Sequence, residues 1–259
     1  MTALAYLVVL LIWSTTALGI RWSVDGFGFL PAVALRMLLT LPLAWLACRW
    51  FGVVLPQTRA ARWTYVAGGL NLFGAMLLTY LGAASINSGV IAVLYGTGPL
   101  LTGLFSIFWL GQRFSWWNWG GLLLALCGLV EIHQQAFQGN ALLLHGALMV
   151  LAGATTQAAM SVWIKRLNAG VPPLALTLGS LMVAVPLYLL SWWLGGWPLP
   201  PAWPLRAGIS LLYMVVFATL IAFSLYGYLL QQLRPVTVAL IQLITPVTSL
   251  LLGHYLNQE

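Results

Sequence analysis

Residues 94–99 read LYGTGP and residues 241–246 read IQLITP, and each stretch lies inside a long apolar segment. A shift of 147 residues superposes the two stretches and places their prolines, Pro99 and Pro246, on one another. Other residues agree with this shift, or with one of 144 residues in the preceding segments. The further aligned pairs are Tyr95 with Gln242, Arg59 with Arg206, Gln112 with Glu259, Arg21 with Lys165 and Pro42 with Pro186.

This internal duplication lies in a very hydrophobic chain. Of the 259 residues, 62% are hydrophobic and only 5% are charged, whereas soluble domains carry roughly 25% charged residues. A soluble globule needs a polar surface that this composition cannot supply, so lipid must be the solvent of the chain. Duplicated apolar sequences of this kind are typical of membrane transporters built from two repeats.

The net charge of +7 does not indicate nucleic-acid binding, because the basic residues fall singly between apolar blocks. The two cysteines, Cys48 and Cys127, lie in or beside different apolar segments and lack the spacing of metal ligands. We therefore expect no metal, no cofactor and no nucleic acid. The expected partners are the lipid bilayer and a small-molecule substrate, and the sequence leaves the oligomeric state open.

Nine apolar segments are long enough to cross a membrane, which takes about 20 residues. Each must be helical, because the bilayer holds no water to satisfy free backbone groups. Five segments form the first repeat, residues 1–132, and four lie in the second, residues 133–259. The predicted spans are residues 3–21, 29–50, 63–84, 86–111, 115–132, 141–164, 173–195, 206–232 and 235–256.

An odd number of helices per repeat forces the second copy to enter the membrane upside down. The sequence therefore predicts an all-α integral membrane protein, a 5+5 inverted-repeat helical bundle with nine helices present. A tenth helix is expected after Glu259 but is absent from the chain. We interpret this absence as a truncation of the sequence, and the alternative is a protein that lacks an element present in its own first half.

The distribution of basic residues predicts a cytoplasmic N-terminus, because lysine and arginine gather in cytoplasmic connections. With that orientation, seven basic residues face the cytoplasm and two face the opposite side. The cytoplasmic set is Arg49, Arg59, Arg62, Arg113, Lys165, Arg166 and Arg234, and the opposite set is Arg21 and Arg206.

Several short motifs follow one another along the chain, and each is weak alone. They are Trp13-Ser14 in the first span, Pro31 with Arg36 at the start of the second, and Gly98-Pro99 ahead of Leu110-Gly111-Gln112-Arg113. In this order they resemble the drug/metabolite transporter superfamily, most closely its EamA-type ten-helix permeases. The resemblance covers the whole chain and implies a basket of helices around a central substrate cavity, working by alternating access in a bacterial inner membrane. The chain departs from the family pattern at Gln112, usually Glu, and at Gln157, often Trp.

The aligned prolines predict two breaks in the helices near mid-depth. A proline lacks an N–H and clashes with the carbonyl four residues back, here the carbonyls of Tyr95 and Gln242. Unsatisfied backbone at that depth is tolerated where it lines a cavity or is buried in protein. We therefore predict helix breaks at Pro99 and Pro246 and a midplane substrate site that contains Tyr95 and Gln242. The alternative is that the prolines only bend the helices for packing.

Other polar and aromatic residues in mid-span are candidates for substrate contact. Amides and hydroxyls inside a membrane seek partners, so each could bind substrate or tie two helices together. These candidates are Trp13, Ser14, Asn71, Tyr80, Gln157, Trp163 and Tyr226. Arg36 lies well inside a span, where a charge is a functional-site hypothesis by default. It would bind a substrate carboxylate or phosphate, or else extend to the outer interface or cap the C-terminal carbonyls of a helix.

The three acids, Asp25, Glu131 and Glu259, fall at span ends or in connections. Proton-coupled pumps for cationic drugs generally place a carboxylate inside the bilayer, so we expect uniport or exchange. The sequence predicts export of a small metabolite, such as an amino acid or another neutral, zwitterionic or aromatic solute. A membrane scaffold without transport activity is the main alternative. An intramembrane enzyme is disfavoured, since the chain has no GxSxG, HExxH or paired intramembrane acids.

Overall fold

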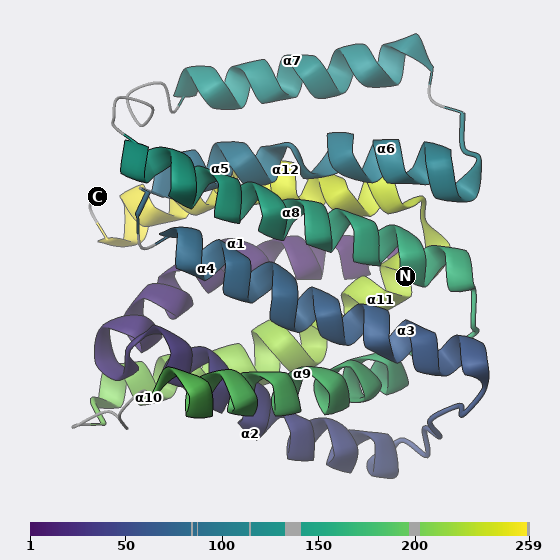
Figure 1. Cartoon of the computed structure of the whole chain (residues 1–259), viewed down its shortest axis with the longest axis vertical. Coiled ribbons are helices and arrows are strands. Elements are labelled where there is room, and N and C mark those ends of the chain that lie inside the picture. The colour runs from purple at the N-terminus through teal and green to yellow at the C-terminus, as the bar shows by residue number, and fades with distance from the viewer. Residues whose placement is uncertain (84, 87, 114, 133–140, 197–202, 258–259) are drawn as a thin grey trace.

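Every regular element in the described part of the chain is a helix, as a backbone satisfied within lipid requires. The computed structural model (Figure 1) describes residues 1–83, 85–86, 88–113, 115–132, 141–196 and 203–257. The elements are α1 (Thr2–Phe27), α2 (Phe29–Trp50), α3 (Arg59–Leu70), η1 (Asn71–Ala75), α4 (Met76–Ala83), α5 (Ser88–Gly96), α6 (Gly98–Leu110), α7 (Trp116–Ile132), α8 (Ala141–Leu167), α9 (Pro173–Gly195), α10 (Leu205–Tyr213), η3 (Met214–Ile221), α11 (Ala222–Gln232) and α12 (Pro235–Asn257). The labels η1 and η3 mark π-helical turns.

Three of the spans are built from consecutive helical pieces. The third span joins α3, η1 and α4, the fourth joins α5 and α6, and the eighth joins α10, η3 and α11. With these pieces counted together, the helices occupy the nine predicted spans, and the predicted all-α bundle is confirmed. Several helices of the described part have the length and hydropathy of a membrane span, among them Phe29–Trp50 and Pro173–Gly195. The predicted tenth helix lies outside the described residues.

The two repeats interlock through their first helices. α1 packs against α10, α11 and α12, which belong to the third and fourth spans of the second repeat. α8, the first span of the second repeat, packs in the same way against α3, α4, α5 and α6. α2 and α9 contact each other, and each also contacts the third span of the other repeat. A pair of inverted repeats produces this reciprocal pattern.

Small residues let α3 and α9 approach closely. A Cβ on Gly68 would overlap Ser180 Oγ, and a Cβ on Gly69 would lie 2.5 Å from the Cβ of Val183. Membrane helices associate through such close packing, because the lipid around them is as apolar as their own side chains. The main core surrounds this contact and includes the fully buried Tyr188. The α3–α9 contact therefore joins the two repeats firmly.

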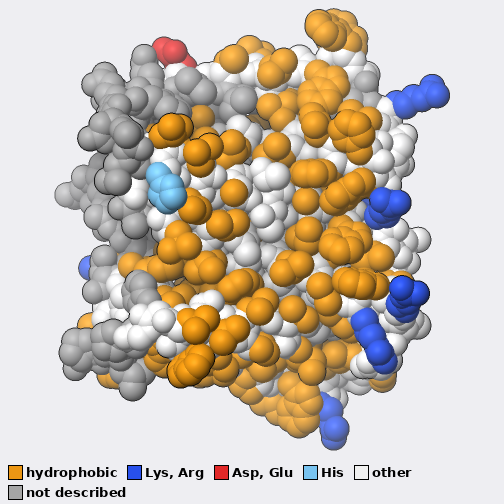
Figure 2. Space-filling model, viewed as in Figure 1, with side chains coloured by type: hydrophobic (Ala, Val, Ile, Leu, Met, Phe, Trp, Pro, Cys, Tyr) orange, Lys and Arg blue, Asp and Glu red, His pale blue; other side chains and the backbone are white. Residues whose placement is uncertain are grey.

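The two ends of the bundle differ in charge. One end carries the connections α2–α3, α6–α7, α8–α9 and α11–α12, and lysine and arginine side chains line this edge in Figure 2. The basic residues of these connections and of the helix ends beside them are Arg49, Arg59, Arg62, Arg113, Lys165, Arg166 and Arg234. We call this the basic end, and we call the opposite end, where α1 ends and α8 begins, the distal end. Apolar side chains cover much of the surface between the two ends (Figure 2).

Candidate functional site

Both repeats carry a π-helical segment near mid-depth in their third span. η1 covers Asn71–Ala75 in the first repeat, and η3 covers Met214–Ile221 in the second. The shift of 147 residues places Asn71–Ala75 on residues 218–222, so the two segments overlap. π-helical turns are rare and occur frequently at functional sites. Their matched positions, which the sequence pattern does not indicate, direct attention to this level of the bundle.

A cluster of aromatic and polar side chains joins the two repeats at this level. The ring of Trp13 in α1 lies 5.2 Å from that of Tyr226 in α11, centroid to centroid. The Tyr226 hydroxyl shares a 2.7 Å hydrogen bond with the hydroxyl of Ser161 in α8, and the Gln157 side chain lies beside it. We call Trp13, Gln157, Ser161 and Tyr226 the aromatic cluster. The structure thus brings together three of the predicted residues and adds Ser161, which the sequence analysis missed.

The second group of predicted residues meets at the junction between α5 and α6. α5 ends at Gly96 and α6 begins at Gly98, one residue before Pro99. A Cβ on Gly98 would overlap Gln242 Oε1, so the Gln242 side chain packs directly on this junction. The hydroxyl of Tyr95 shares a hydrogen bond with the hydroxyl of Thr79 in α4. The equivalent positions of the two repeats, Tyr95 and Gln242, therefore both lie beside this one helix junction.

Thr79 is the first-repeat equivalent of Tyr226 under the shift of 147 residues, as Tyr95 is of Gln242. Each repeat thus carries one tyrosine in this pair of positions, but on a different helix. Because the second repeat is inverted, the pair Thr79 and Tyr95 lies towards the distal end, and Tyr226 and Gln242 lie towards the basic end. The sequence offered no sign of Thr79, which reads as an ordinary helical threonine.

The second proline differs from the prediction. α12 continues through Pro246 as one helix from Pro235 to Asn257, so no break corresponds to the one between α5 and α6. A proline removes one backbone hydrogen bond, and neighbouring helices and threonine side chains can re-satisfy the freed groups in a membrane. Beside Pro246, the Thr245 hydroxyl donates to the carbonyl of Ile241 at 2.6 Å. A single missing hydrogen bond has therefore not interrupted the helix.

Two further predicted residues connect helices. Ser14 is 1% exposed, and its hydroxyl shares a hydrogen bond with the hydroxyl of Thr248, which joins α1 to α12. Trp163 in α8 stacks on Trp63 in α3 with ring centroids 5.9 Å apart, in the half of the bundle nearer the basic end. Both contacts fit the alternative reading, in which such side chains tie helices together.

Asn71 and Tyr80 occupy the third span of the first repeat. Asn71 is 5% exposed and is the first residue of η1, so an amide side chain is buried at the level of the π-helical turn. Tyr80 lies in α4, and its side chain lies outside the described residues. Asn71 thus remains a candidate for substrate contact because of its position in the structure. Tyr80 remains a candidate from the sequence alone.

Arg36 connects the second span of one repeat to the π-helix of the other. It is 4% exposed, and its Nε donates to Thr219 Oγ1 in η3 at 2.6 Å. Thr219 in turn donates to the carbonyl of Met214 at 3.0 Å, five residues back. A buried charge is tolerated in a membrane when it is hydrogen-bonded within the bundle. Arg36 therefore lies inside the protein and does not extend to the outer interface.

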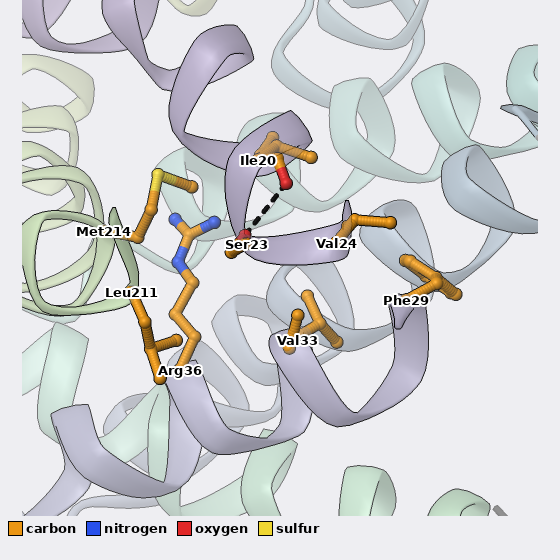
Figure 3. A pocket seen from close by; sticks show the side chains of 9 residues that line it. Ile20, Ser23, Val24, Phe29, Val33, Arg36, Leu211 and Met214 are labelled. Carbon is orange, nitrogen blue, oxygen red and sulfur yellow. Dashed lines mark hydrogen bonds between the residues drawn. The ribbon is translucent and has the colours of Figure 1, made fainter. Parts of the chain in front are cut away.

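A small cavity lies beside Arg36, towards the distal end (Figure 3). Ser23 lies on its wall and donates to the carbonyl of Ile20 at 2.9 Å. The lining residues are Ile20, Ser23, Val24, Phe29, Ala32, Val33, Arg36, Leu211 and Met214. The cavity has room for about one water molecule at most. In this conformation it does not accommodate a metabolite.

The aromatic cluster and the α5–α6 junction offer phenol, indole, amide and hydroxyl groups. The one acid among the described side chains, Glu131, is exposed near the distal end of α7. Within the described ranges, no three or more histidine, cysteine or acidic residues gather in a way that could hold a metal ion. The arrangement can bind a neutral or zwitterionic solute through hydrogen bonds and ring contacts.

Proteins similar to this chain include several that are named as transporters. The inner membrane transporter YedA of Escherichia coli (strain K12) is 28% identical over 253 residues, which are 96% of this chain and 80% of the relative. A probable terminal-alkyne amino-acid exporter of Streptantibioticus cattleyicolor is 24% identical over 262 residues, 98% of this chain and 85% of the relative. One crystal structure superposes with a TM-score of 0.83 at 22% identity, over 100% of this chain and 88% of the other. That structural similarity shows a shared fold.

Nearly the whole sequence matches one protein family. The profile of the EamA-like transporter family matches residues 1–132 and 144–259. This match confirms the resemblance carried by Trp13-Ser14, Arg36 and Gly98-Pro99. The relatives named as transporters agree with it and favour transport over catalysis. The chain therefore belongs to the EamA-like transporter family and is a multi-pass membrane transporter.

Proposed function

We propose that this transporter exports a small neutral or zwitterionic metabolite, such as an amino acid, by alternating access around a site in the middle of the bundle. The aromatic cluster is the observation that carries the proposal, because Trp13 of the first repeat meets Tyr226 and Gln157 of the second there. Transporters with inverted repeats bind substrate at the interface of the repeats, near the bilayer midplane. Tyr226 lies at that interface, little more than one turn beyond η3.

The chemistry of the site supports this substrate class. Indole and phenol rings contact apolar and aromatic groups and attract an ammonium group over their faces. The amides of Gln157 and Gln242 can hydrogen-bond a carboxylate or an amide. Pumps for cationic drugs generally place a carboxylate inside the bilayer, and the described side chains near the site include none. The relative named as an amino-acid exporter points to the same class.

We further propose that the basic end faces the cytoplasm of a bacterial cell, with the N-terminus inside and the chain in the inner membrane. The support is the gathering of arginines at that end (Figure 2), since cytoplasmic connections are enriched in lysine and arginine. A reporter fused after Ala136, between α7 and α8, should then lie outside the cytoplasm. A cytoplasmic reporter at this position would contradict the orientation.

Transport itself can be tested in proteoliposomes with a panel of radiolabelled amino acids and other small solutes. We expect counterflow of at least one zwitterionic solute, and its strong reduction by Tyr226→Ala and by Gln242→Ala. Leu124→Ala is a matched control, because Leu124 is 75% exposed on α7, away from the site. No flux of any solute through the unmodified protein would contradict transport, and full flux through both site variants would contradict the site.

A further inference from the structure

We propose that backbone contacts at glycines close the distal end of this transporter and form its distal gate. The contacts join α4 to α8 and α1 to α10, which pairs the third span of each repeat with the first span of the other. The inference rests on the proposed alternating access, because a solute that leaves through the distal end must pass between these helices. The glycines named below are the residues that keep the distal end closed.

The contact between α4 and α8 extends over two turns. A Cβ on Gly82 would lie 2.5 Å from the carbonyl oxygen of Gly146. A Cβ on Gly153 would lie 2.5 Å from Thr79 Oγ1 and 2.8 Å from the carbonyl oxygen of Ala75. Gly146 and Gly153 are seven residues apart, so they lie on the same face of α8. The backbones touch here, with no room for side chains between them.

In the other half of the molecule, glycines of α1 pack against side chains of α10 and of Met214, the first residue of η3. A Cβ on Gly26 would overlap the Cβ of Ala207, and a Cβ on Gly19 would lie 2.9 Å from Met214 Sδ. The Ser210 hydroxyl donates to the carbonyl of Gly19 at 2.6 Å, in buried surroundings. Gly19 and Gly26 are again seven residues apart. Both helix pairs are thus closed by glycines, and both contacts lie in the distal half of the bundle.

The same spans are separated by larger side chains towards the basic end. The third and sixth spans meet there through the stacked rings of Trp63 and Trp163, 5.9 Å apart. The first and eighth spans meet through Trp13 and Tyr226. Side chains of this kind can change rotamer and open a path without moving the helices, whereas touching backbones must move apart as whole helices. The two ends are therefore closed in different ways.

The chain provides a place at which such a movement can occur. η1 joins α4 to the rest of the third span, and η3 joins α10 to the rest of the eighth. A π-helical segment has a different hydrogen-bond pattern from the helix on each side, and such segments mark functional positions. The small cavity beside Arg36 also borders the α1–α10 contact, since Ile20, Leu211 and Met214 line it (Figure 3). The helices are thus packed less tightly at the cavity than at the neighbouring contact of Gly19 and Gly26 with α10 and η3.

A leucine in place of a gate glycine should hold the distal end open. We suggest spin labels at positions 81 and 144, in a variant without the native cysteines, because Leu81 in α4 and Leu144 in α8 are 49% and 63% exposed. Gly146→Leu and Gly153→Leu should each lengthen the distance between the labels. The matched control is Gly128→Leu in α7, where a Cβ meets no atom within 4 Å, and it should leave the distance unchanged. Unchanged distances in both gate variants would overturn the proposal.

A disulfide across the contact gives a second test that does not depend on how leucine is accommodated. A Cβ on Gly146 would lie 3.0 Å from the Cβ of Ser85, and an outward shift of about 0.5 Å brings this pair into the range of about 3.5–4.5 Å in which Ser85→Cys and Gly146→Cys form a bond. Oxidation should abolish flux and reduction should restore it, while each single variant should be insensitive. Flux that persists in the oxidised protein would overturn the gate. Absence of flux in the reduced protein would count against the proposed function instead, and the label distances would still decide the gate.

Discussion

The two repeats build the same pair of positions from different residues. In the first repeat the pair is Thr79 and Tyr95, whose hydroxyls bond to each other. In the second repeat the pair is Tyr226 and Gln242, and each of these has a different partner. Tyr226 bonds to Ser161, and Gln242 packs on Gly98 of the first repeat. The tyrosine has moved from the fourth span of one repeat to the third span of the other.

This difference teaches how a duplicated fold can hold an asymmetric solute. Two identical halves would present the same groups towards both ends of the bundle. Here the basic side of the site carries the rings of Trp13 and Tyr226 together with the Gln157 amide, and the distal side carries a tyrosine and a threonine. For the zwitterionic solute proposed above, these unlike sides favour a single orientation, which the symmetric backbone alone would not impose.

The largest expected effect that separates the two repeats is that of Tyr226→Ala. Tyr226 is 3% exposed and contacts Trp13, and replacing a large buried aromatic residue by alanine typically lowers the free energy of unfolding by about 3–5 kcal/mol. Tyr95→Ala should cost clearly less, because Tyr95 is only partly buried. Unfolding in mixed micelles with increasing SDS measures the free energy of unfolding of both variants. Equal losses at the two positions would show that the repeats use their tyrosines alike.

A second expectation concerns the close approach of Gln242 to the α5–α6 junction. Gly98→Ala places a Cβ on Gln242 Oε1, and overpacking of this kind costs about 1–3 kcal/mol. Gln242→Ala removes the overlapping atoms, so the double variant should be more stable than the sum of the single effects predicts. Gly120→Ala is the matched control, since a Cβ there meets no atom within 4 Å. A loss at Gly98 no larger than at Gly120 would refute the contact.

Hydropathy and the internal shift were enough to predict the nine spans and the inversion of the second repeat, because both follow from the length of apolar segments and the odd number of helices in a repeat. They also directed attention to Tyr95 and Gln242, which both lie beside the α5–α6 junction. The prediction for Pro246 was less successful. Pro99 lies at the beginning of a new helix, whereas α12 continues past Pro246, and the identity of the proline alone does not distinguish these outcomes.

Other features depend on contacts that a single sequence does not reveal. The π-helical turns η1 and η3 arise from a local change in hydrogen-bond pattern that has no signature in hydropathy. Ser161 and Thr79 were missed because a hydroxyl inside a membrane helix can be satisfied by a carbonyl of its own helix. Both residues do make such bonds, and each also reaches a tyrosine on a neighbouring helix. Only the packing of α4 on α5 and of α8 on α11 shows the second partner.

The smallest expected effects are those of Thr79→Ala and Ser161→Ala, which each remove the hydroxyl partner of one tyrosine. Hydrogen bonds between membrane helices contribute about 0.6 kcal/mol on average, so each variant should be only slightly less stable. Double-mutant cycles with Tyr95→Phe and Tyr226→Phe should show coupling within each pair and additivity between the pairs. Coupling between Thr79 and Tyr226 would instead mean that the equivalent positions share one hydrogen-bond network. In that case the two sides of the site would respond to a solute together, and the asymmetry of the tyrosines would not fix its orientation.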